Sequence, residues 1–213
     1  MAVPYKAPVK DIVFGYEVID SYSVLNKISA FSDFSEDIVI PTMEECAKFS
    51  EEILAPINSI GDQQGATIKD GVVTMPEEFV DAYKKFAEAG WASISLPSDI
   101  GGGGMPITLS GGTLEILSTA NLAFGLAPGL SAGAISAINF HGNQEQKDKF
   151  LPKLVSGEWT GTMNLSEPQS GSDLGTITTK AEPQEDGSYK ITGTKAVSYT
   201  HLTLPTKCGG YVA

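Results

Sequence analysis

The sequence predicts an α+β protein in which an N-terminal all-α helical domain is followed by the start of an antiparallel β domain. Apolar residues recur at intervals of three and four up to about residue 157, and beyond it they alternate with polar residues. Asp186-Gly187 is a typical hairpin turn between two alternating segments. Because helices precede strands and do not alternate with them, we expect segregated domains and no parallel dinucleotide-binding fold. We predict a helical domain over residues 1–157 and a partial β domain over residues 158–195.

Composition narrows the class of protein. With 213 residues, of which 41% are hydrophobic, the chain can bury a sizeable core. Its net charge of −12 argues against a nucleic-acid partner, because phosphate contacts need basic surface patches. All 14 basic residues are Lys. An anionic cofactor must therefore be held by backbone amides, hydroxyls, Lys side chains or a partner segment, and not by the fork of an Arg in these residues.

The sequence also bears on the compartment. The N-terminus, MAVPYKAPVKD, lacks the apolar core of a signal peptide, and no run of about eighteen apolar residues is evident. Cys46 and Cys208 lie in unlike contexts, so we expect no disulfide framework and a reducing compartment. These features predict a cytoplasmic protein with no membrane partner.

Three helical patterns occupy the first part of the chain. The spacing predicts helices from Asp11, as N-cap, to about Ser29, from Pro41 to Ile60, and from Pro76 to Glu88. The second helix is amphipathic, and its acidic face is interpreted as solvated surface. The stretch from Gly61 to Thr74 is expected to be a polar connection with a tight turn at Asp70-Gly71.

A run of four glycines, Gly101 to Gly104, opens the next region. It has neither a following Lys-Ser/Thr nor the strand-to-helix spacing of a nucleotide fingerprint, so we interpret it as a flexible surface loop. Two apolar helices rich in small residues, from about Ile107 to Phe124 and from about Leu130 to Phe140, are predicted to centre the helical core. A further helix runs from its cap Asn143 to Leu154, with Gln146 in the capping-box position.

The densest chemistry lies in the stretch WTGTMNLSEPQSGSDLG, which begins at Trp159. Its first part predicts a short strand from Thr160 to Leu165, which Ser166-Glu167-Pro168 ends because proline offers no amide to a ladder. Glu167 stands directly before Pro168, and we interpret it as a structural carboxylate of this turn. The pattern therefore changes from strand to turn within a few residues.

The loop after this turn has the character of a ligand site. Gly171 can adopt positive φ and bring bare amides near a ligand, Ser172 offers a hydroxyl, and Asp173 can fold back on local amides. Such a loop suits phosphate or a polar heterocycle. His141 lacks a carboxylate–His–nucleophile pattern around it, and we predict no metal ligands.

Two stretches, LVSGEWTGTMNLSEPQSGSDLG and ITTKAEPQEDGSYKITGTK, resemble the acyl-CoA dehydrogenase family, whose signature is a strand ending in Thr/Ser-Glu-Pro and a Gly-Ser-Asp loop. The segments YKAPVKDIVF, FAEAGW and HGNQEQKDKFLPKL are most similar to the longer bacterial branch of that family. The resemblance covers Tyr5 to Lys195. It implies a helical N-terminal domain, a middle β domain and a C-terminal helical domain, with FAD between them. This chain would supply the first and part of the second.

The resemblance also implies a cofactor site in this chain. The cofactor-binding residues that it implies are Met163, Asn164, Leu165, Ser166, Gly171 and Ser172. In this assignment Met163 to Ser166 lie along the flavin, the Ser166 hydroxyl bonds its polar edge, and Gly171 with Ser172 closes the cofactor and acyl-CoA site. Ser172 is thus also assigned to substrate binding. Many relatives have an aromatic residue in place of Met163 and Thr in place of Ser166.

The reaction implied is α,β-dehydrogenation of an acyl-CoA thioester, in which a carboxylate removes the α-proton while the β-hydride passes to the flavin. In the family the base is usually a Glu of the C-terminal helical domain, which lies beyond residue 213, so no catalytic residue is assigned here. Electron-transfer flavoprotein or a similar acceptor, and a homo-oligomeric full-length parent, are further implications of the resemblance.

After Lys195 the sequence no longer resembles the family, and it continues as AVSYTHLTLPTKCGGYVA. We hypothesise that residues 196–213 are a non-native tail and that the fragment is inactive by itself. Two alternatives to a dehydrogenase fragment stay open. One is a non-catalytic helical interaction module, consistent with the missing base and the acidic exterior. The other is an acyl-CoA oxidase-type flavoenzyme.

Overall fold

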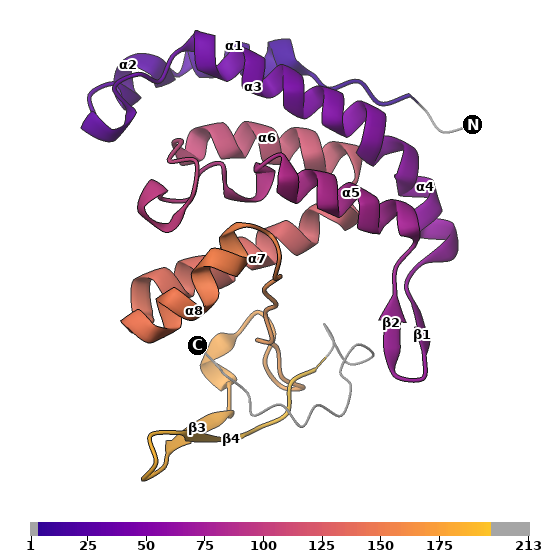
Figure 1. Cartoon of the computed structure of the whole chain (residues 1–213), viewed down its shortest axis with the longest axis vertical. Coiled ribbons are helices and arrows are strands. Elements are labelled where there is room, and N and C mark those ends of the chain that lie inside the picture. Colours follow the sequence, from indigo (N-terminus) through magenta and orange to yellow (C-terminus); the bar gives the residue numbers. More distant parts are fainter. Residues whose placement is uncertain (1–3, 197–213) are drawn as a thin grey trace. The chain divides into compact units, whose positions relative to one another are not determined.

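Residues 4–196 are described by the computed structural model, in which they divide into two units. Unit 1 ends at Gly161 and unit 2 begins at Thr162. Unit 1 is built mainly of helices, as Figure 1 shows, and unit 2 contains a short antiparallel sheet. The predicted α+β class, with helices first, is confirmed. The tail predicted at 196–213 lies outside the described residues except for Ala196, and the predicted domain boundaries stay predictions.

The helices of unit 1 pack as successive layers (Figure 1). Helix α3 packs against α1 and α6, α6 packs against α7, and α7 packs against α8. The bounds are α1 (Val9–Val18), α2 (Ser21–Leu25), α3 (Glu36–Phe49), α4 (Ala55–Gln64), α5 (Glu77–Glu88), α6 (Ile107–Ala120), α7 (Leu122–His141) and α8 (Gln144–Val155). Short 3₁₀ turns lie at Ser29–Phe31, Trp91–Ser93 and Ser98–Ile100.

The first predicted helix is two helices. Asp20 adopts a left-handed φ of 52° and separates α1 from α2. Helix α1 begins at Val9, so Asp11 lies in its first turn and does not cap it. Tyr16 is buried on the inner face of α1, and its hydroxyl donates to the Thr108 carbonyl at 2.8 Å.

The helix predicted from Pro41 begins earlier and contains a π turn. Helix α3 starts at Glu36 with Pro41 inside it, and Ser50–Leu54 form the π turn. Pro56, which has no N–H, follows immediately at the start of α4. A π turn shifts the helical hydrogen bonds by one residue, and such a shift accommodates a missing donor. The π turn of Ser50–Leu54 therefore accommodates Pro56.

The connection between α4 and α5 is a β-hairpin that the sequence pattern missed. Strands β1 (Thr67–Lys69) and β2 (Val72–Thr74) pair antiparallel across the predicted turn. Asp70 and Gly71 both have positive φ, of 52° and 78°, as a two-residue type I′ turn requires. Strands of three residues are too short for a visible alternation, so only the turn was predictable.

Backbone hydrogen bonds hold the four-glycine loop in one conformation, and the expectation of a flexible loop is wrong. Four successive amides, from Gly102 to Met105, donate to carbonyls of the same loop at 2.9–3.1 Å. The acceptors are Pro97, Ser93, Leu96 and Ile94. A Cβ on Gly103 would lie 2.6 Å from the Ile94 oxygen, so the close approach demands glycine. Because these amides are already paired, the loop has none of them to offer a phosphate.

Asn121 sets the boundary between α6 and α7. Its backbone N–H bonds the Leu117 carbonyl at the end of α6, and its side chain caps α7 by accepting from Phe124 N–H at 3.1 Å. The predicted boundaries at Phe124 and Leu130 are therefore wrong, because one capped junction replaces a loop. Helix α7 continues through Pro128 as a single helix of 20 residues.

Helix α7 is also less buried than expected for the centre of a core. It is long and apolar enough to cross a membrane by length and composition, yet only 22% of its apolar window is buried. Leu122, Leu126 and Phe140 are exposed. From the sequence we expected no apolar segment long enough to cross a membrane, and α7 is such a segment. Gly and Ser interrupt its apolar run without adding charge, so the mean hydropathy of the helix stays high.

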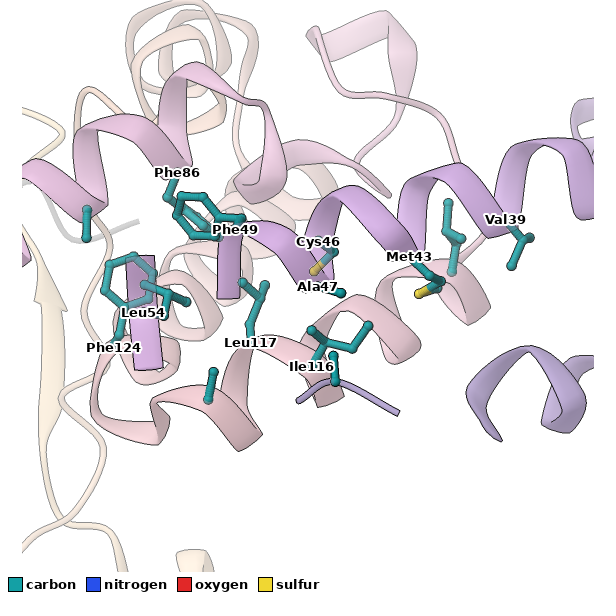
Figure 2. Close-up of a cluster of buried hydrophobic side chains, with 14 of the residues drawn as sticks. Val39, Met43, Cys46, Ala47, Phe49, Leu54, Phe86, Ile116, Leu117 and Phe124 are labelled. Atoms are coloured by element: carbon teal, nitrogen blue, oxygen red, sulfur yellow. The ribbon is translucent and has the colours of Figure 1, made fainter. Parts of the chain in front are cut away.

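The main core of unit 1 lies between α3, α5, α6 and the start of α7 (Figure 2). Met43 and Cys46 of α3 are fully buried. The rings of Phe86 on α5 and Phe124 on α7 meet edge to face at 5.4 Å. Burial raises the pKa of the Cys46 thiol to about 12. A second cluster joins α7 to α8, whose predicted capping box at Asn143 and Gln146 is confirmed.

Unit 2 contains strands β3 (Lys180–Pro183) and β4 (Tyr189–Thr192), which pair antiparallel across the predicted turn at Asp186-Gly187. A 3₁₀ turn at Leu174–Thr176 precedes them. The strand predicted from Thr160 to Leu165 is absent, because within residues 4–196 this segment has no ladder partner. It is an ordered but irregular segment.

Candidate functional site

The residues predicted to bind a cofactor all lie in unit 2. Met163 is 54% exposed, Asn164 is exposed, and Leu165 and Ser166 are half-buried. Within the described part of the chain, the N–H groups of residues 163–166 and the Ser166 hydroxyl make no hydrogen bond. These groups are therefore available to a ligand. Such a row of donors suits the acceptor edge of a polar heterocycle.

Two carbonyl groups of the same segment, those of Leu165 and Ser166, are held by hydrogen bonds, in contrast to its amides. Lys195 Nζ donates to the Leu165 carbonyl oxygen at 3.0 Å. The N–H of Ala196 donates to the Ser166 carbonyl oxygen at 3.0 Å. The chain after β4 thus returns and fixes two successive peptide groups. These two carbonyls position the segment, while the amides of residues 163–166 have no partner among residues 4–196.

Glu167 is the centre of the loop that follows. Its side chain is 1% exposed, and it is surrounded by donors from both sides of the loop. The hydrogen-bond donors are Thr178 N and Oγ1 (both 2.9 Å), Thr179 N (3.0 Å) and Oγ1, Gln169 Nε2 (2.6 Å) and Lys195 Nζ (3.0 Å). Hydrogen bonds from the Thr179 side chain and the Thr178 backbone, with Lys195 adding to them, hold the pKa of Glu167 well below its ordinary value. Glu167 is thus an ionised carboxylate at neutral pH.

This environment supports the interpretation of Glu167 as structural. Both carboxylate oxygens are occupied by several donors. A group whose pKa is so low accepts a proton poorly near neutral pH, and a general base works best with a pKa near the operating pH. The hydrogen bonds of Glu167 organise the turn, and its low pKa disfavours a role as general base.

The backbone at Glu167 closes a tight turn. Its N–H and carbonyl both pair with Ser170, at 2.8 and 3.0 Å. The Ser170 hydroxyl donates to the Asp173 carbonyl at 2.7 Å, and Asp173 Oδ1 accepts from Gly175 N–H at 2.9 Å, as predicted for an Asp that folds back on local amides. The loop is therefore held from within and does not depend on a ligand for its shape.

Gly171 and Ser172 lie at the exposed tip of this loop. Gly171 does not adopt positive φ, so the expectation of a left-handed glycine is wrong here. A Cβ at Gly171 would meet nothing within 4 Å. Open space, and not backbone conformation, is thus what this glycine provides. The Ser172 hydroxyl has no hydrogen-bond partner among residues 4–196 and faces solvent.

The sequence did not reveal which residues hold the Glu167 carboxylate in place. Thr178 and Thr179 look like ordinary alternating strand residues, and Lys195 looks like a surface lysine. The only available signal was the unusual position of a Glu before Pro in a turn. Apart from Gln169, the donors to the Glu167 carboxylate lie 11 to 28 residues away, and no local pattern marks such pairs.

Other groups in the described residues add no further reactive site. His141 is exposed at the end of α7. In the described part of the chain, no group of three or more His, Cys, Asp and Glu residues could hold a metal ion. Unit 1 has an apolar groove of about 420 Å³ between α6, α7 and the loop before α6. It is lined by residues such as Ile107, Leu114 and Phe140.

Comparison with known proteins places the chain among related sequences. The family model of the acyl-CoA dehydrogenase N-terminal domain matches residues 42–158. The 3-methylmercaptopropionyl-CoA dehydrogenase of Ruegeria pomeroyi is 41% identical over 191 residues, which are 90% of this chain and 32% of that protein. The chain thus spans about a third of the length of this curated relative.

Solved structures give the same result for the fold. An acyl-CoA dehydrogenase from Bacillus anthracis, complexed with FAD, matches with a TM-score of 0.62 and 27% identity, covering 77% of this chain and 26% of that chain. A structure described as the electron transferring flavoprotein of Acidaminococcus fermentans matches with a TM-score of 0.63 and 26% identity. It covers 76% of this chain and 40% of that chain.

Proposed function

We propose that this chain, which belongs to the acyl-CoA dehydrogenase family, is the N-terminal part of an FAD-dependent enzyme. That enzyme introduces an α,β double bond into an acyl-CoA thioester. One observation carries the proposal. Residues 163–166 offer amides and a Ser hydroxyl without partners among the described residues, on a segment in which the Leu165 and Ser166 carbonyls are held by hydrogen bonds. A related acyl-CoA dehydrogenase was solved in complex with FAD.

The residues present suit a flavin. The free amides and the Ser166 hydroxyl match the acceptor atoms along the polar edge of an isoalloxazine ring. Met163 is an exposed, flexible apolar side chain that can lie against an aromatic surface. The Ser166 hydroxyl would contribute about 0.5–1.5 kcal/mol net, and more toward developing negative charge. These residues would form one wall of the cofactor site.

Gly171 and Ser172 are proposed to border the acyl-CoA end of the site. The open space at Gly171 permits close approach of a ligand, and the Ser172 hydroxyl is free to donate or accept. The bound FAD supplies the hydride acceptor for the β-carbon. The contribution of this chain is to orient the flavin edge and border the thioester, so that the reacting atoms are aligned. The α-proton acceptor is not among the residues assigned here.

The electron acceptor, assembly state and compartment are proposals of the same kind. Electron-transfer flavoprotein or a similar acceptor fits the family, and one structural relative is described as an electron transferring flavoprotein. We propose a homo-oligomeric, cytoplasmic full-length parent. An acyl-CoA oxidase-type flavoenzyme would differ in using oxygen to reoxidise the flavin. Stopped-flow reoxidation of the reduced full-length protein, with oxygen or with electron-transfer flavoprotein, separates these two.

The central experiment compares the 213-residue chain with the product of the intact gene. We expect the isolated chain to purify colourless and to show no acyl-CoA-dependent dye reduction, because it carries one wall of the site. The intact product should carry stoichiometric FAD that acyl-CoA bleaches. If the intact product binds no FAD, the proposed function is wrong. A yellow, substrate-bleachable preparation of the isolated chain would instead overturn its assignment as half a site.

A second candidate function, a helical interaction module without cofactor, is favoured by one observation. Helix α7 has a high mean hydropathy, and Leu122, Leu126 and Phe140 on it are exposed. Exposed apolar surfaces of this kind mark contacts with other polypeptides. The FAD content of the intact gene product also distinguishes this candidate, since a binding module would carry no flavin.

A further inference from the structure

The contacts between residues 165–167 and residues 195–196 join two parts of unit 2 that are about 30 residues apart. Lys195 Nζ lies 3.0 Å from both the Leu165 carbonyl oxygen and Glu167 Oε1. One ammonium group therefore links the backbone of the candidate site to its central carboxylate. Ala196 N–H adds the next contact, 3.0 Å from the Ser166 carbonyl oxygen.

These contacts restrict the rotation of the segment. Successive carbonyls of an irregular or extended chain point in different directions, so holding two neighbouring ones fixes both peptide planes. The Cα–Cβ direction of Ser166 follows from the planes on either side of it. The direction of the Ser166 hydroxyl and of the free amides is therefore limited by Lys195 and Ala196.

Glu167 keeps Lys195 in this position. The Glu167 side chain is 1% exposed and the Lys195 side chain is 32% exposed, so the ion pair is largely shielded at its acidic end. Thr178 and Thr179 hold the carboxylate independently of Lys195. Loss of Lys195 should therefore leave the Glu167 turn folded while releasing the Leu165 carbonyl.

We propose that Glu167 and Lys195 are a positioning pair, which holds the Leu165–Ser166 backbone so that its free amides and the Ser166 hydroxyl face a ligand. The inference rests on the proposed function for the identity of that ligand, FAD. Neither residue is required to touch the cofactor. The pair acts through the backbone of residues 165 and 166, and Lys195 is the member whose removal tests this.

The test uses the full 213-residue chain labelled with ¹³C and ¹⁵N. Three Lys195 and Lys190 variants are compared with the wild type: Lys195→Met, Lys195→Arg and, as the matched control, Lys190→Met. Lys190 is an exposed lysine on β4 of the same unit. The first readout is the carbonyl ¹³C shift of Leu165 and Ser166. The second is a titration with free FAD, followed by the amide shifts of residues 163–166. Circular dichroism at 222 nm checks that the helices of unit 1 are intact.

We expect Lys195→Met to move the Leu165 carbonyl shift and to raise the FAD half-saturation concentration roughly three- to tenfold, the range for one lost hydrogen bond. Lys195→Arg, which keeps the charge and the donors, should restore both readouts. Lys190→Met should behave as wild type. Glu167→Gln should repeat the Lys195→Met effect on FAD, and its control is Glu182→Gln on the exposed strand β3.

Two results would overturn the positioning role. One is an unchanged Leu165 carbonyl shift in Lys195→Met. The other is a shifted carbonyl with FAD half-saturation equal to wild type. A wild-type chain that shows no saturable response to FAD would show that this half of the site does not bind the cofactor by itself; the proposed function is decided separately, by the FAD content of the intact gene product. In that case the carbonyl shifts of Lys195→Met and Lys195→Arg still decide whether the pair holds the backbone.

Discussion

Replacing Asn121 by Ala should destabilise unit 1 more than any other helix-cap substitution in it. Asn121 is 1% exposed at the junction of α6 and α7. Its Nδ2–H donates to the Leu54 carbonyl at the end of the π turn at 3.1 Å, while its Oδ1 caps the Phe124 N–H. Asn121 thus joins three helical segments, because its backbone N–H also bonds the Leu117 carbonyl of α6 while its side chain bonds the other two. Its two functional groups serve different elements.

The expected cost follows from these two bonds. Losing the bond to Leu54 should cost about 0.5–1.5 kcal/mol, and leaving the buried Phe124 N–H unpaired should cost about 1–3 kcal/mol. The sum is about 1.5–4.5 kcal/mol, which lowers the melting temperature of a unit of this size by about 3–18 °C. Asn143→Ala is the matched control, because Asn143 is an exposed N-cap of α8 and should lose only about 1 kcal/mol.

Thermal and urea unfolding followed at 222 nm measure both variants. Asn121→Asp separates the two roles, because it keeps the acceptor for Phe124 N–H but places an unpaired buried charge against the Leu54 carbonyl. We expect Asn121→Asp to be at least as destabilised as Asn121→Ala at neutral pH. If Asn121→Ala costs no more than Asn143→Ala, the reasoning about a three-way junction is wrong.

Three further predictions test other parts of the chain. The pKa of Glu167 is lowered in the folded state, so the stabilisation from its ionised form is complete above its ordinary pKa of 4.5 and is lost as the pH falls toward the folded-state pKa. The protection factor of the Thr178 amide, which is the intrinsic exchange rate at each pH divided by the observed rate, should therefore fall below pH 4.5 in the wild type, and a Glu167→Gln variant should lack this pH dependence. Gly102→Ala should destabilise the loop before α6, because the added Cβ would overlap the backbone of Leu96. Gly111→Ala, in open space on α6, should instead stabilise the protein by about 0.5–1 kcal/mol, and urea unfolding measures both variants. In a variant whose only thiol is Cys46, a maleimide at pH 8 should label the protein no faster than it unfolds. The reason is that the Cys46 thiol is buried and its pKa is raised to about 12. Rapid labelling of the native protein would contradict this.

Much of the architecture was predictable from local pattern. The helical period identified the helices of unit 1, and the capping box at Asn143 identified the start of α8 within a residue. The tight turns at Asp70-Gly71 and Asp186-Gly187 were also predictable. Boundaries failed where one side chain decided them, as at Asn121, or where a residue left the helical region, as at Asp20.

The residues of the candidate site were predictable from the sequence, but the residues that hold Glu167 and the Leu165 carbonyl in place were not. The motif around Ser166 and the loop at Gly171 indicated where a cofactor would bind, and they remain predictions. The expected strand was wrong, because an isolated apolar alternation does not form a strand without a partner. The expected positive φ at Gly171 was wrong as well, because glycine permits that conformation without requiring it.

The sequence by itself determined the helical and strand periods, the turn residues and the family signature, because each of these depends on residues a few positions apart. Only the tertiary structure decided that the four-glycine loop has paired amides, that Asn121 joins α6, α7 and the π turn, and that Lys195 holds the Leu165 carbonyl. The physical reason is that burial and hydrogen bonds between distant residues depend on which groups the fold brings together. Glu167 illustrates the difference: the sequence marks it as unusual, and its partners 28 residues away give it a role.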